Sequence, residues 1–176
     1  MSFLLSLLTI AVVLVILCIR GSRKKTQLSA ASWDQLVAKL EAVPIDGIAK
    51  VATDYLQPRK GQLAIETDEM WFLVGEEEGL RRMEANAKVL LALAAFASQW
   101  NFQESVIVAE RMRRDGMILR RAAFRLSAGL LLGFGKTTGP FSVQEAASAY
   151  WLMRERLLAL YQTSHAARYP SLVAAL

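Results

Sequence analysis

Cysteine and histidine are nearly absent from this sequence, with one residue of each in 176. Because Cys18 has no second cysteine to pair with, the chain can form no internal disulfide, which fits a reducing compartment such as the cytoplasm. A single thiol also cannot build a cysteine metal site. His165 has Gln162 three residues before it, so the Glu-x-x-His motif of helical metal sites is missing. We therefore expect no metal site, and we expect His165 to lie at the surface or near a helix C-terminus.

An intact nucleotide-binding loop and a strongly basic domain are also lacking. Residues 133–138 include Gly-Lys-Thr, but a phosphate-binding loop needs glycine where Leu130 stands. The net charge of +5 includes four cations within residues 20–25, which leaves residues 26–176 with seventeen Lys and Arg against sixteen Asp and Glu. A nearly neutral domain does not favour nucleic acid. The sequence therefore predicts no cofactor, no nucleic-acid partner and no enzymatic activity.

Residues 3–19 contain no charged residue, no glycine and no proline. As a helix this run would be about 25 Å long, near the lower limit for crossing a hydrocarbon core of about 30 Å. A cleaved signal peptide is one alternative, but no cation precedes the run and no small-residue cleavage site follows it. A core helix is another, but the domain would have to cover a helix that is apolar on every face. We expect an uncleaved transmembrane helix.

The charges beside this segment predict its orientation. Four cations follow it directly, and no charged side chain precedes it. Cationic flanks remain on the cytoplasmic side of a membrane, so we expect a single-pass protein with its N-terminus outside. Residues 1–25 then form the anchor, and residues 26–176 form a cytoplasmic domain. The flanking cations are Arg20, Arg23, Lys24 and Lys25.

The periodicity of the remaining chain predicts an all-α fold, a helical bundle of three long helices and two or three short ones. The long helices are expected over residues 76–100, over 102–131, and from a capping box at Ser142 to about residue 164. Residues 133–140 should form a loop. Short helices are expected over 33–43, after Asp46 and over 68–74, with a β-hairpin at 62–75 as the alternative to the last.

Each long helix carries one stripe of apolar and small residues at spacings of three and four, which we call its seam. The three seams predict the core of a bundle, and the short connections favour antiparallel neighbours. In chain order the seams are Leu80, Met83, Ala87, Leu90, Ala94 and Ala97; Ala109, Met112, Gly116, Leu119, Ala123, Leu126 and Leu130; and Val143, Ala146, Tyr150, Met153, Leu157 and Leu160.

Arginines along residues 102–131 predict a positively charged stripe roughly opposite the seam. At about 100° per residue four of them share one side of the helix: Arg111, Arg114, Arg121 and Arg125. A solvated outer face is the simplest interpretation, although Glu110 and Asp115, which lie four residues from Arg114 and Arg111, can reduce the charge locally. The alternative is a docking surface for an acidic partner or for lipid headgroups.

An acidic segment offers a counterpart to this stripe. Six acids with no base between them stand within thirteen residues: Glu66, Asp68, Glu69, Glu76, Glu77 and Glu78. We hypothesise that they meet the arginine stripe, either within one chain or between two chains.

These observations favour a single-pass membrane protein that acts as an accessory, scaffold or adaptor for other membrane-associated proteins. Membrane lipid, a protein partner in or at the membrane, and self-association are the expected interactions. A membrane-tethered enzyme is the first alternative, with a site built from the scattered residues Glu104, Arg111, Tyr150 or His165. The second alternative is a permanent small subunit of a large membrane complex, which should expose an apolar face when isolated.

Overall fold

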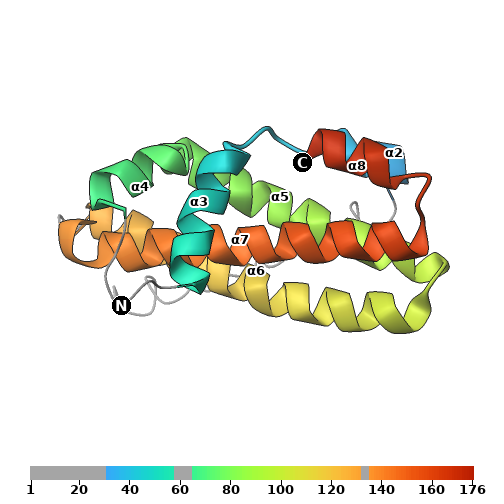
Figure 1. Ribbon diagram of the computed structural model, residues 1–176. Helices are drawn as coiled ribbons and strands as arrows, with labels where there is room; N and C mark the ends of the chain where they lie inside the picture. The colour runs from blue at the N-terminus through green and yellow to red at the C-terminus, as the bar shows by residue number, and fades with distance from the viewer. Residues whose placement is uncertain (1–30, 58–64, 132–134) are drawn as a thin grey trace, which may run out of the picture.

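The computed structural model describes residues 31–57, 65–131 and 135–176. Within these ranges the chain is all-α and contains no strand, as the periodicity predicts (Figure 1). The helices are α2 (Trp33–Val37), α3 (Ile45–Leu56), α4 (Thr67–Leu73), α5 (Glu76–Phe96), α6 (Phe102–Leu131), α7 (Gly135–Ser164) and α8 (Tyr169–Ala175), with a short 3-10 turn, η1 (Ala97–Gln99), after α5.

The expected anchor at residues 3–19 and its flank of Arg20, Arg23, Lys24 and Lys25 lie outside the described residues. In the ranges that are described, no helix combines the length and the apolar character needed to cross a membrane.

Helices α6 and α7 form a long antiparallel pair at the centre of the fold, and α5 packs against both (Figure 1). Helices α3 and α4 cover α7, while α2 and α8 lie near its C-terminal end. The predicted seams form the core between these layers. Every seam residue of α5 and α7 is buried, and so are the apolar seam residues of α6 from Ala109 to Leu126, apart from the half-buried Gly116.

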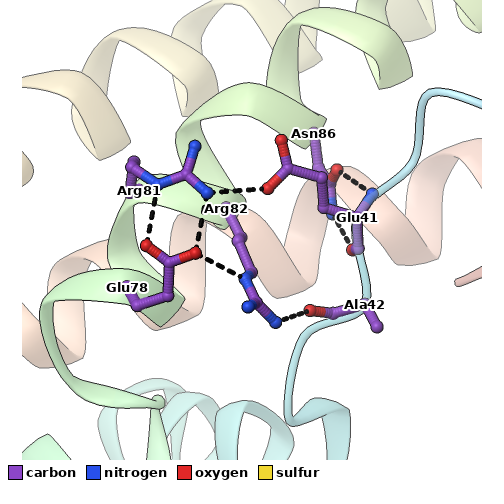
Figure 2. A network of polar contacts seen from close by, with 6 residues as sticks. All are labelled: Glu41, Ala42, Glu78, Arg81, Arg82 and Asn86. Atoms are coloured by element: carbon purple, nitrogen blue, oxygen red, sulfur yellow. Dashed lines mark hydrogen bonds and ion pairs between the residues drawn. The ribbon is translucent and has the colours of Figure 1, made fainter.

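The first helix is shorter than predicted. The capping box at Ser32 is present, because its hydroxyl accepts from the Gln35 amide and the Gln35 side chain accepts from the Ser32 amide. However, α2 ends at Val37 rather than at residue 43. The Asn86 side chain of α5 bonds both the N–H and the C=O of Glu41, at 2.8 and 2.7 Å (Figure 2). These tertiary bonds satisfy the backbone of Glu41 outside a helix.

The uncertain segment at residues 62–75 is helical from Thr67 to Leu73, so the helix prediction is confirmed for its described part. Asp68 and Glu69 occupy the first turn, where carboxylates are stabilised by the helix dipole. Gly75 then adopts φ +81°, a left-handed conformation that glycine adopts without steric cost. This residue separates α4 from α5 and stops the short helix where the sequence predicts.

The predicted loop at residues 133–140 is wrong from Gly135 onward. Helix α7 begins there, and Pro140 lies inside it. Ser142 is therefore not a helix cap but a buried residue within α7, 4% exposed. The neighbouring Val143 and Gln144 are also buried, so packing against the other helices stabilises a helical turn that local sequence signals place outside the helix.

Candidate interaction surface

The predicted arginine stripe lies on the outer side of α6. Arg111, Arg114, Arg121 and Arg125 are all exposed, and so is Ile107 beside them. We call these five residues the basic face of α6. The seam on the opposite side of the helix packs against α5 and α7, which forces the arginines outward. Periodicity therefore located this face correctly, and its binding function remains a prediction.

Within one chain, the described part of the structure shows no ion pair between the basic face and the acidic segment. Glu69 pairs with Lys50 at 2.8 Å, and Glu78 pairs with Arg81 and Arg82 at 2.7 and 3.0 Å. Two Arg81 hydrogen bonds and one from Arg82 lower the pKa of Glu78 to about 2 (Figure 2). The described residues therefore show no intramolecular pairing of this kind, and pairing between two chains stays a prediction.

Two acidic residues at the α6–α7 boundary form ion pairs with arginines of the neighbouring helix, which the sequence pattern did not predict. Arg125 forms an ion pair with Glu145 of α7. Asp115 is only 6% exposed and pairs with Arg156 of α7 rather than with Arg111. Burial lowers the pKa of Arg156, and the positive charge of Arg111 lowers it further. Arg111 thus keeps its charge exposed beside a second cation.

A groove follows the boundary between α5 and α6. It consists of two hollows of about 600 and 340 Å³, which share Glu84. We call them the acidic hollow and the apolar hollow, and together the α5–α6 groove. The acidic hollow is lined by residues that include Trp71, Glu76, Glu77, Leu80 and Ala123. The apolar hollow takes its name from Ala87, Leu91, Gly116, Met117 and Leu119, and five charged residues also line it: Glu84, Lys88, Glu110, Arg113 and Arg120.

Exposed apolar side chains stand along the groove side of α6, and the sequence analysis missed them. Met117 is 53% exposed and lines the groove, while Phe124 is 74% exposed and follows the lining residue Ala123. Phe102 and Val106 continue the same stripe, at 71% and 47%. The signal was present, because these residues recur at helical spacing on a side away from the seam.

An aromatic cluster packs where α2, the end of α5 and the residue before α8 meet. The guanidinium carbon of Arg168 lies 4.9, 5.4 and 5.0 Å from the ring centres of Trp33, Phe96 and Trp100, distances at which a cation is attracted to an aromatic face. His165 packs its ring against Trp100, with the ring centres 4.5 Å apart. His165 therefore lies past the end of α7, as expected, and its ring packs that end of the chain against Trp100, the residue that follows η1.

Ionisation of Tyr161 is expected to lower the free energy of unfolding of the protein by about 2 kcal/mol between pH 10 and pH 12. Burial raises the pKa of Tyr161 to about 12 from an ordinary value of 10.0. Its hydroxyl accepts from Trp33 Nε1 at 3.1 Å and donates to the Leu93 carbonyl at 3.0 Å. The folded state favours the neutral phenol, so this stabilisation is complete below pH 10 and is lost as pH rises toward the folded-state pKa.

Chemical denaturation across this pH range would measure the effect, with Tyr161→Phe as the comparison. Burial also raises the pKa of Tyr150, so only the difference in slope between the two proteins reports on Tyr161. We expect a shallower pH dependence for Tyr161→Phe. Equal slopes would contradict the assignment.

The residues of the enzyme alternative contact different partners. Glu104 bonds Asn101, at the start of α6, and Thr163. Tyr150 is buried and accepts from Asn86 at 3.2 Å, and His165 packs on Trp100. Arg111 is exposed on the basic face. In residues 31–57, 65–131 and 135–176, no group of three or more His, Cys, Asp or Glu could hold a metal ion.

The surfaces that stand out are therefore the basic face of α6 and the α5–α6 groove, on adjacent sides of one helix. Comparison with protein-family models, curated proteins and solved structures finds no match to this chain.

Proposed function

We propose that this protein is a single-pass, membrane-anchored adaptor whose cytoplasmic domain binds another membrane protein in the α5–α6 groove. The observation that carries the proposal is the groove itself, with apolar lining residues that include the exposed Met117 of α6. Aromatic residues, Met and Arg are enriched at protein interfaces.

The charges of the groove specify the partner. Glu76 and Glu77 line the acidic hollow, Glu84 lines both hollows, and none of the three forms an ion pair within the described part of the chain. A fitting ligand is an amphipathic helix with cations at one end and apolar side chains along one face. Membrane proteins carry such cations in the cytoplasmic segments that follow their spans.

The expected anchor makes weak binding sufficient. Residues 3–19 would hold the domain at the membrane, with the N-terminus outside and the basic flank in the cytoplasm. A domain tethered to the same membrane as its partner binds at a raised effective concentration. A shallow groove can then serve as a functional site.

A permanent small subunit of a membrane complex is the second candidate. Its support would be the apolar side chains that are exposed in the isolated fold, since a constant partner would cover an apolar face. The four most exposed are Phe72, Phe102, Phe124 and Phe141, at 66–74%.

Groove variants are expected to recover about 10-fold less partner than the wild type, which is the size of effect expected for a residue at the centre of an interface. The full chain, tagged and extracted from its native membranes in mild detergent, would be compared with Met117→Asp and Glu84→Lys, and the associated proteins would be quantified. Val173→Asp on α8 is the matched control, because Val173 is 39% exposed and is not a lining residue of either hollow.

Three outcomes would decide between the candidates. Equal recovery of the partner with all variants would refute the groove, and recovery of no partner would refute the adaptor. A stoichiometric partner whose removal destabilises this chain would support the permanent subunit. An alkaline carbonate wash tests the anchor separately, since a protein without a span would leave the membrane pellet.

A further inference from the structure

We propose that the basic face of α6 docks on anionic lipid headgroups of the membrane that anchors the chain. This inference rests on the anchor in the proposed function, and it concerns a surface distinct from the groove. At about 100° per residue, Arg114 and Arg121 project from a side of α6 different from that of the groove residues Arg113 and Arg120. One side of α6 then meets a bilayer while the adjacent side remains open to a protein.

The charge of the face matches an anionic surface. Arg111, Arg114 and Arg121 are exposed and form no ion pair within the described chain, whereas Arg125 shares Glu145. The nearest buried acid, Asp115, is already paired with Arg156. From Arg111 to Arg125 the stripe is about 21 Å long. Guanidinium groups in such a row can each bind phosphate oxygens with two hydrogen bonds.

The length of the chain before α2 keeps the domain close to the membrane. Residues 20–30 are the only segment between the apolar run and the first described residue. Even when fully extended, these residues would reach at most about 40 Å. Helix α6 is itself about 45 Å long, so the domain cannot move farther from the bilayer than its own dimension.

The first described residues, which follow residues 20–30 in the sequence, lie at the end of the domain where α6 begins. Trp33 of α2 and Trp100, two residues before α6, both lie against the Arg168 guanidinium, at 4.9 and 5.0 Å. Figure 1 places α2 and α8 at this end. Ile107 of the basic face is 56% exposed at this end. Apolar side chains flanked by arginines suit the boundary between headgroups and acyl chains.

The cytoplasmic leaflet carries the anionic lipids of a membrane, and the basic flank would place the domain on that side. A lipid surface therefore complements the exposed, positively charged face through charge alone. An acidic protein on this face is the competing occupant, and the test below distinguishes the two.

Proximity to lipid can be measured with the full chain in nanodiscs. In a Cys18→Ser background, a fluorophore would be placed at Ile107→Cys or Gln103→Cys on the outer side of α6, and at Tyr55→Cys on α3 as the control. Headgroup-attached quenchers would then report contact. We expect quenching at positions 107 and 103 in discs containing phosphatidylserine, and little in phosphatidylcholine discs or in high salt. Position 55 should remain unquenched.

The matched variant is Arg111→Gln/Arg114→Gln/Arg121→Gln, which removes three charges at exposed positions. We expect it to shift the docking equilibrium about 100-fold toward the undocked state. Lack of quenching at 107 in anionic discs, quenching that ignores lipid charge, or equal quenching at 107 and 55 would each overturn the proposal. An acidic protein partner would give the first of these results. Failure of the chain to co-elute with discs would instead refute the anchor.

Discussion

Gly47→Ala is expected to lower the free energy of unfolding by about 4 kcal/mol, at the upper end for a single substitution. A β-carbon on Gly47 would clash with the backbone oxygen of Leu73 and would lie 2.8 Å from its carbonyl carbon. The clash is with backbone, so no side-chain rotation can relieve it. Helix α3 would have to move away from the end of α4, and both cover α7.

Denaturation of the full chain in mild detergent, followed by circular dichroism, would measure this loss. Gly116→Ala is the matched control, because its β-carbon would meet only Met153 and Leu91 side-chain atoms at ordinary distances, 3.7 Å or more. There the gain in helix propensity should keep the change between neutral and about 1 kcal/mol stabilising. Equal stability of Gly47→Ala and the wild type would show that α3 and α4 do not approach each other as described.

Asn86→Ala is expected to cost about 3 kcal/mol, because one buried side chain joins three parts of the fold. Asn86 is 1% exposed. Its amide oxygen accepts from the Glu41 N–H, and its amide nitrogen donates to the Glu41 carbonyl and to the Tyr150 hydroxyl. Alanine would leave the buried hydroxyl of Tyr150 without this donor and would release the segment that follows α2 (Figure 2).

Arg81→Ala provides the comparison within the same network. Arg81 reaches Glu78 and Glu41, but its side chain is 58% exposed, so solvent screens both pairs. Surface pairs of this kind contribute about 0–1 kcal/mol. Measured side by side, Asn86→Ala should be the far more destabilising variant. If the two variants lose the same stability, burial does not strengthen the contacts of Asn86.

The long helices could be predicted because their apolar spacing coincides with the helical period over many turns. Met83 and Leu90 of α5, like Met153 and Leu157 of α7, are fully buried where that spacing places them. Local signals were less informative at the ends of helices. The capping motif at Ser142 is overridden by the burial of its own side chain, which a sequence pattern cannot reveal.

Of the two candidate surfaces, the basic face could be predicted from the sequence and the groove could not. The outward position of Arg114 and Arg121 follows from periodicity alone, since a seam that faces the core sends the opposite side to solvent. The groove required knowledge of which helix lies beside α6. Leu91 of α5 and Met117 of α6 meet only because α5 packs against the α6–α7 pair. Only that arrangement shows that the exposed Met117 of α6 lines a groove.

By itself the sequence determined the helical class, the core-facing side of each long helix and the position of the basic face, because these depend on repeats within a single helix. Only the tertiary structure decided which charges pair and where a groove opens. Asp115 forms an ion pair with Arg156 rather than with Arg111, and Arg125 forms one with Glu145, because neighbouring helices supply these partners. Contacts between residues distant in sequence depend on packing geometry, which no local spacing records.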